Sequence, residues 1–361
     1  MTERRALFPD MSPTRWSVAG VVLLALCLFP LAESNQYVLT VFVTSMILAV
    51  LNISWNFVLG IAGVWNFGQL AIYALGGYGA GILMLHTSLP AALDVIVGGL
   101  MAAAISIVMA VPTLRLFGIY TSLLTFAFAE VVQYVIENTS TGLTGGTFGF
   151  PSVRGLYGSL SPVVAMHAYY WTVLGIIVIS MVGVALLSRS RLGIGLRAIR
   201  DAPGFAAARG VSPLRYRMLA FALSGFLAGV AGALYLSFNQ SIAPTVMGLT
   251  AMSIDVTMLV IGGLGTLFGP IIGTTIVAVV ETLLVSYPGI EFTVVGAVLL
   301  VIVIFVPGGV VGLASRVRSR LPTWNARPRP GVMGSGSSPP RPAAALGDGV
   351  PALHTSDGQE R

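Results

Sequence analysis

Apolar residues dominate the chain in long runs, separated by short polar or glycine-containing stretches. A helix needs about 20 apolar residues to cross the hydrocarbon core of a bilayer. Such runs predict membrane helices at 17–32, 37–59, 68–86, 91–111, 117–137, 169–187, 217–238, 250–265, 269–287 and 292–312. The expected fold class is therefore an all-α integral membrane protein, a polytopic bundle of about ten helices with its membrane domain at 17–312.

Two of these segments contain glycine interruptions, "ALGGYGAGIL" at 74–83 and "VIGGLGTLFGPIIG" at 260–273. We expect half-spans or broken helices there, which sets the number of spans at eight to ten. Each interrupted segment is the third in a set of five, and the two sets start on opposite sides of the membrane. This pattern indicates a 5+5 inverted-topology repeat, in which broken helices meet near the bilayer midplane.

Composition supports the membrane class and narrows the chemistry. Hydrophobic residues make up 56% of the chain and charged residues 9%, whereas a soluble domain carries about 25% charged residues. All 19 basic residues are arginines, so a phosphate-binding loop or a Schiff base, which need lysine, is excluded. One cysteine and three histidines cannot build a structural zinc site. We expect no cofactor and no metal, and we expect that the chain does not hydrolyse nucleotide with its own residues.

The arginines also predict orientation, because cytoplasmic loops of membrane proteins are rich in arginine and lysine. With residues 1–16 in the cytoplasm, Arg154 is the one arginine that falls outside. Both termini are then cytoplasmic, as in a multi-pass protein of a bacterial inner membrane. A cleaved signal peptide is the competing interpretation of the first apolar run, although no small-x-small cleavage site stands out.

The last segment, 320–361, is rich in proline, glycine and serine and has no apolar period. It is expected to be a disordered cytoplasmic tail. Its arginines are expected to lie against anionic lipid headgroups.

The longest internal cytoplasmic loop, 188–217, carries seven arginines. Part of this charge is explained by orientation alone. The sequence "LRAIRDAPGFAAARG" also predicts a short helix that stops near Pro203 and a small-residue helix over 204–209 that Gly210 closes. Small residues allow close approach to another protein, and arginine suits bidentate pairing with carboxylates. We therefore favour a docking element over a plain orientation signal.

The stretch "GLRAIRDAPGFAAARGVSPLRYRMLAFALSGFLAGVAGALY" (195–235) resembles the cytoplasmic loop and following helix of branched-chain amino acid ABC permeases, in particular the M-type subunit of the leucine–isoleucine–valine importer. Further similar blocks follow in the family's order: "LNISWNFVLGIAGVWNFGQLAIYALGGYGAGIL" (51–83), "TLRLFGIYTSLLTFAFAEVV" (113–132), "NTSTGLTGGTFGF" (138–150), "IGGLGTLFGPIIGTTIVAVVETLL" (261–284) and "FVPGGVVGL" (305–313). The urea permease of the same family shares nearly all of them.

The resemblance implies that residues 195–210 form a coupling helix seated in a cleft of a separate ATPase subunit. The candidate coupling residues are Arg197, Arg200, Asp201, Gly204, Ala206, Ala207 and Gly210. The chain departs from the family at Pro203 and Ala207, where many members carry glutamates, and at Ala202. These departures make the loop more basic than usual and put in doubt which charges contact the ATPase.

Polar residues within the spans are the candidates for a substrate path, since a charge at mid-bilayer costs about 2.5–3.5 kcal/mol. Glu130, Asp255 and Glu281 lie within predicted spans. Each either meets an ammonium group of the solute or bridges helices inside the bundle.

A second group of candidates is polar but uncharged. Asn66 and Gln69 are expected to face the interior of a broken span, and Thr144, Gly145 and Gly146 to offer backbone groups at the external mouth. A turn without a chemical role has the same sequence pattern.

The leading function is a permease subunit of an ABC importer for branched-chain amino acids or a related small polar solute, with urea or a short amide as the alternative. Its partners would be two ATPase subunits, an H-type sister permease, a solute-binding protein and membrane lipid, but no nucleic acid. An ion-coupled secondary transporter is the rival mechanism. It needs carboxylates at the midplane but not the small-residue cytoplasmic helix. An integral membrane enzyme is disfavoured, because the sequence shows neither a metal-ligand cluster nor a nucleophile–base pair.

Overall fold

The computed structural model describes residues 35–87, 90–113, 115–116, 118–139, 144–150 and 153–284, together with positions 296, 297 and 309. The predicted first helix, the cytoplasmic segment before it and the predicted tail lie outside the described residues. So does the last predicted helix, apart from the three isolated positions.

The described residues form helices and, among them, no strand; a single isolated bridge pairs Phe150 with Ile242. The helices of the membrane body are α2 (Gln36–Asn56) with its π-helical continuation η1 (Phe57–Ala62), α3 (Gln69–His86), α4 (Ala91–Thr113), α5 (Ile119–Asn138), α7 (Pro162–Arg189), α10 (Pro213–Asn239), α11 (Leu249–Gly262) and α12 (Gly269–Leu284). The connecting helices are η2 (Gly146–Phe148), α8 (Arg191–Asp201), α9 (Pro203–Ala208) and η3 (Pro244–Met247).

Five helices in the described part of the chain are long and apolar enough to cross a membrane: α2 with η1, α4, α5, α7 and α10. α11 and α12 are shorter apolar helices, and α3 has 18 residues. The predicted class, an all-α polytopic membrane protein, is thus confirmed. The 5+5 repeat is tested by none of these helices and stays a prediction.

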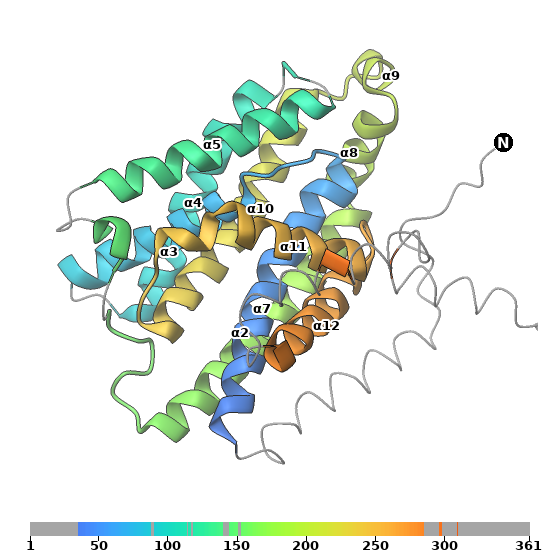
Figure 1. Ribbon diagram of the computed structural model, residues 1–361. Helices are drawn as coiled ribbons and strands as arrows, with labels where there is room; N and C mark the ends of the chain where they lie inside the picture. Colours follow the sequence, from blue (N-terminus) through green and yellow to red (C-terminus); the bar gives the residue numbers. More distant parts are fainter. Residues whose placement is uncertain are drawn as a thin grey trace, which may run out of the picture. The chain divides into compact units, whose positions relative to one another are not determined.

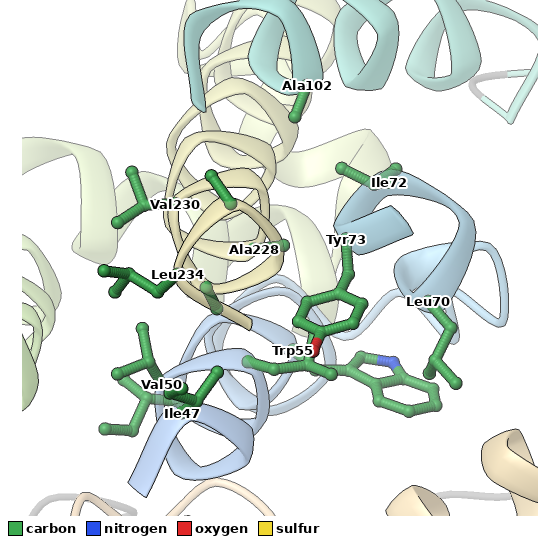
Figure 2. Packing of buried hydrophobic residues seen from close by; sticks show 14 of the residues in the cluster. Ile47, Val50, Trp55, Leu70, Ile72, Tyr73, Ala102, Ala228, Val230 and Leu234 are labelled. Carbon is green, nitrogen blue, oxygen red and sulfur yellow. The ribbon is translucent and has the colours of Figure 1, made fainter. Parts of the chain in front are cut away.

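Helix α10 packs against α2, α3 and α4 (Figure 1). Figure 2 shows apolar side chains of these helices gathered around it, with Ala228 of α10 near Tyr73 of α3 and Trp55 of α2. The approach is close because glycines face one another. A Cβ on Gly76 would lie 2.2 Å from the Cα of Gly229, and a Cβ on Gly232 would lie 1.9 Å from the carbonyl oxygen of Tyr73.

This packing corrects one prediction. The segment 74–83 is not interrupted, since it lies inside the continuous helix α3. Its glycines remove side chains where α10 and α4 press against α3, as small residues do in membrane helix pairs. The irregular backbone lies instead before α3, at residues 63–68.

The second interruption is confirmed. α11 ends at Gly262 and α12 begins at Gly269. Gly263 (φ 105°) and Gly265 (φ 74°) adopt backbone conformations that suit glycine. With 14 residues, α11 is only about 21 Å long. The hydrocarbon core of a bilayer is about 30 Å thick, so α11 alone is too short to cross it.

Polar contacts group the connections at two ends of the bundle. The end of α2, helix α8 and the α11–α12 connection meet at one end, through Arg200 to Gly60 and Asn56 to Thr266. At the other end the loop before α7 contacts the segment after α10, where the amide of Phe150 donates to the carbonyl of Ile242. This grouping matches the predicted alternation of loops. The arginine distribution predicts that the first end is cytoplasmic.

Candidate functional site

The arginine-rich segment folds as two short helices, α8 and α9, at one end of the bundle (Figure 1). α8 buries Leu196 and Ile199 against the membrane body. Gly195 leaves room for the ring of Tyr216, whose Cε1 lies 2.3 Å from where a Cβ would stand. Pro203 begins α9, and Gly210 follows its end with φ 80°. The predicted pair of helices is confirmed.

Two of the candidate coupling residues point into the protein. Nη2 of Arg197 donates to the carbonyl of Ser188 (2.6 Å), which closes the end of α7. Nη1 of Arg200 donates to the carbonyl of Gly60 (2.7 Å) in η1. Both guanidinium groups therefore hold α8 in place by internal hydrogen bonds.

The remaining coupling candidates gather at the tip formed by α9 and its flanks. Gly204, Ala207 and Gly210 are exposed there, and the side chain of Asp201 is 67% exposed, whereas Ala206 is buried. We call the exposed residues 201–210 the α9 tip.

Phe205 is the tip residue that our sequence analysis missed. Its side chain is 65% exposed, and the guanidinium carbon of Arg209 lies 5.2 Å from its ring centroid. An aromatic and an arginine are the residue types that most often anchor a protein interface. The available signal was a lone aromatic residue within a run of small residues.

The first polar cluster within the membrane body contains Asn66 and Gln69. Nδ2 of Asn66 donates to Oε1 of Gln69 (2.8 Å), and Nε2 of Gln69 donates to the hydroxyls of Ser54 and Ser224 (both 2.9 Å). All four side chains are buried. The cluster joins α2, the start of α3 and α10. Asn66 also borders a small apolar pocket lined by Trp55, Leu59, Trp65, Phe67, Val256, Leu259, Val260 and Leu264.

Asp255 lies apart from that cluster, buried where α11 meets α2 and α12. Nδ2 of Asn52 lies 3.3 Å from Oδ1 of Asp255 and 3.0 Å from Oγ1 of Thr274. This arrangement bridges three helices. Glu281, on α12, is half-buried.

Glu130 lies on the exposed face of α5, near the middle of this helix. Gln133, Tyr134 and Glu137 continue the same face by helical spacing, and Nε2 of Gln133 donates to Glu137 (2.9 Å). The side chain of Tyr134 is 68% exposed. α5 thus presents a polar stripe where a helix facing lipid would be apolar.

Thr144, Gly145 and Gly146 form a tight turn at the opposite end of the bundle from α9. The hydroxyl of Thr144 donates to the carbonyl of Ile136 (3.1 Å), and Gly145 and Gly146 have φ values of 75° and 59°. The turn presents Phe148, which is 91% exposed and which our sequence analysis did not single out. The substrate-path candidates therefore occupy four separate places rather than one site.

Five long apolar helices, with further apolar helices beside them, define a multi-pass membrane protein. The chain belongs to the family described as the permease component of the branched-chain amino acid transport system, whose model matches residues 37–307.

Several curated proteins are similar to the chain. The high-affinity branched-chain amino acid transport system permease protein LivM of Escherichia coli (strain K12) is 26% identical over 73% of this chain and 68% of its own length. The probable branched-chain amino acid transport permease protein LivH of Methanocaldococcus jannaschii is 29% identical over 54% of this chain and 61% of its own length. The autoinducer 2 import system permease protein LsrC of an Enterobacter strain is 28% identical over 61% of this chain and 71% of its own length. No solved structure matches the chain significantly.

Proposed function

We propose that this chain is one of two membrane subunits of an ATP-driven importer that moves branched-chain amino acids inward across a bacterial plasma membrane. The observation that carries the proposal is the exposed α9 tip, which follows α8, a helix fixed to the membrane body by Arg197 and Arg200. A rigidly mounted tip suits a subunit that is moved by a partner. ATP is bound by two separate ATPase subunits, not by this chain.

The ATPase contact is made by the exposed half of the segment. Phe205 enters the cleft of the ATPase, with Arg209 and Asp201 as its charged rim. Small residues at 204 and 207 allow the ATPase surface to approach closely. Arg197 and Arg200 act from the membrane side, since their guanidinium groups are occupied internally.

The second membrane subunit packs on the exposed face of α5. An ionised carboxyl group in the middle of a lipid-facing helix costs about 2.5–3.5 kcal/mol, so Glu130 faces protein or water instead. Within the described residues, no hydrogen-bond partner of Glu130 lies in this chain. A sister permease subunit on this face would supply that environment, and a water-filled path between the two subunits would be lined by the polar stripe of α5.

The solute-binding protein docks at the other end of the bundle. The glycine turn 144–149 holds Phe148 outward, and the Phe150–Ile242 contact ties the turn to the segment after α10. Binding at both ends gives the solute-binding protein and the ATPases a common body to act on.

The solute itself is supported by the family and by the LivM and LivH relatives, while the LsrC name shows that related permeases serve other solutes. Urea or a short amide is the alternative within the same transporter class. A secondary transporter is the alternative mechanism. The observation that favours it is the buried carboxyl group of Asp255, which Asn52 ties to α2.

The test is uptake of labelled leucine into proteoliposomes that contain this chain, its sister subunit and the two ATPases, with the solute-binding protein added on the side of Phe148. The proposal predicts uptake that requires ATP on the α9 side. Uptake by the purified chain alone, driven by an ion gradient, would contradict it. Uptake of urea but not leucine would support the ATP-driven mechanism and would show that the solute is urea rather than a branched-chain amino acid.

The matched variants are Phe205→Ala and Ile194→Ala. Both side chains are exposed and apolar (65% and 59%), but Ile194 lies on α8 outside the tip. Because interface anchors contribute about 2 kcal/mol or more, Phe205→Ala is expected to weaken ATPase binding by at least about thirtyfold. Ile194→Ala is expected to leave it unchanged. If both variants bind the ATPase equally well, Phe205 is not part of the interface.

A further inference from the structure

The end of α2 is a π-helix, η1, and one of its carbonyl groups is taken by the cytoplasmic segment. The amide of Gly63 donates to the carbonyl of Val58, and so does the amide of Val64 (3.2 Å). The carbonyl of Gly60 instead accepts from Nη1 of Arg200 at 2.7 Å. Single-turn π-helices are rare and concentrate at functional positions. A hydrogen bond from a guanidinium group is also about twice as strong as a neutral one.

The aliphatic part of the Arg200 side chain also packs closely against the backbone, as its guanidinium group does. A Cβ on Gly63 would lie 2.2 Å from Cγ and 2.5 Å from Cδ of Arg200. Gly63 has φ 70°, so glycine is favoured there for its backbone as well as for its missing side chain. The arginine therefore cannot move along η1 without losing both contacts.

The opposite side of the same segment holds the α11–α12 connection. A Cβ on Gly60 would lie 2.5 Å from the Cα of Gly265. The side-chain amide of Asn56 accepts from the amide of Gly265 (2.7 Å) and donates to the carbonyl of Thr266 (2.8 Å). Residues 56–63 are thus clamped between the cytoplasmic helix pair and the break in the second half of the bundle.

We infer that Arg200 is a positioning residue that transmits movement of the α9 tip through η1 to the α11–α12 connection. The inference rests on the proposed function and adds to it the route along which ATPase movement reaches the membrane helices. The contacts are short and continuous: tip, α8, Arg200, Gly60, Gly265. Arg200 does not touch the ATPase in this scheme, which separates it from Phe205.

A purely local role for Arg200 is the competing explanation, because an arginine near a helix end also satisfies free carbonyl groups. That role predicts lower stability without any change in the response to ATP. The two roles are therefore separated by a readout of coupling measured on the assembled transporter.

The variants are Arg200→Ala, Arg200→Lys and Gly63→Ala, and their controls are Arg191→Ala and Gly175→Ala. Arg191 is an exposed arginine of the same segment, and a Cβ on Gly175 meets nothing within 4 Å. Each is made in the full assembly with both ATPases and the sister subunit. The measurements are ATPase co-purification, ATP hydrolysis and leucine uptake per ATP hydrolysed.

A fourth readout does not depend on the solute. The α11–α12 connection is probed by the maleimide labelling rate of Leu264→Cys in a Cys27→Ser background, with and without ATP and vanadate. ATP is expected to change this rate in the parent chain and in both controls, but not in Arg200→Ala or Gly63→Ala.

Arg200→Ala and Gly63→Ala are expected to keep ATPase co-purification and to lower uptake per ATP by about tenfold, the equivalent of losing about 1.4 kcal/mol. Arg200→Lys is expected to recover part of the loss, because an ammonium group still donates to Gly60. If Arg200→Ala fails to assemble with the other subunits, the same measurements on Arg200→Lys and Gly63→Ala test the inference. If ATP still changes the labelling rate in the assembled variants as it does in the parent chain, the inference is overturned. Loss of ATPase binding in these variants also overturns it, because Arg200 would then contact the ATPase directly. A parent chain that binds no ATPase would instead overturn the proposed function and, with it, this route.

Discussion

Asn56 shows how a single side chain stabilises irregular backbone between two helices. Its amide group pairs with the amide of Gly265 and the carbonyl of Thr266, two backbone groups that belong to no helix. A buried backbone group that lacks a hydrogen-bond partner is costly. One residue of α2 therefore makes the break between α11 and α12 possible.

Asn56→Ala is expected to leave both backbone groups without their partner. Each buried unsatisfied group costs about 1–3 kcal/mol, so the melting temperature of the purified chain should fall clearly. Asn138→Ala is the matched control, because Asn138 is exposed and its side-chain amide donates to the carbonyl of Tyr134 in its own helix. Equal melting temperatures for the two variants would contradict the role assigned to Asn56.

Glycine decides the packing at the scale of helices. α3 and α10 approach so closely that Gly232 contacts the backbone of Tyr73. The same residue type has a second use between α11 and α12, where positive φ values allow the chain to turn. Both uses appear in the sequence as glycine-rich apolar stretches.

Gly232→Ala is expected to separate α3 from α10, because the added Cβ would lie 1.9 Å from a backbone oxygen that cannot move aside. The cost lies at the upper end of the roughly 1–3 kcal/mol typical of overpacking. The measurement is the yield of monodisperse protein after extraction in detergent. Gly175→Ala on α7, where space is open, should give the parent yield. A normal yield for Gly232→Ala would mean that the two helices are not held by this contact.

The glycines explain why the helices were easier to predict than the break. Hydrophobic runs located α4 and α12 to within a few residues, since length and apolarity alone define a span. The predicted interruption at 74–83 was wrong, because glycines that allow helices to pack closely and glycines that end helices look alike in a sequence. The predicted interruption at 260–273 was right, because the glycines there do end a helix.

Side-chain direction limited the prediction of the site. The sequence correctly placed two short helices in the arginine-rich segment, and it named Arg197 and Arg200 as candidate coupling residues without indicating that they form hydrogen bonds inside the protein. Their partners are the carbonyls of Ser188 and Gly60, and a carbonyl left free by helix geometry has no signature in the sequence. Phe205 and Phe148 were missed because exposure depends on the fold.

For the whole molecule, the faces left open indicate where partners bind. α5 carries Glu130 and Tyr134 on an exposed stripe, whereas the exposed face of α7 is apolar at Ile179 and Val182. Lipid suits the second face, and a second subunit suits the first.

A photo-crosslinking amino acid at Tyr134 is therefore expected to capture the sister membrane subunit, while the same probe at Ile179 should capture lipid. The two positions are equally open, with 68% and 70% of the side chain exposed. The products are separated by mass on a denaturing gel. Capture of the subunit from Ile179 but not from Tyr134 would move the interface to α7.

In the proposed assembly the α9 tip lies in the cytoplasm and is bound there by an ATPase subunit. This central claim is tested most directly by labelling Gly204→Cys, in a Cys27→Ser background, with a membrane-impermeant maleimide. Gly204 has open space around it, so the substitution fits without a clash. We expect no labelling in intact cells, rapid labelling in inverted vesicles stripped of ATPase, and protection when the ATPases are added back. Labelling from the outside of intact cells, or labelling that the ATPases do not change, would contradict it.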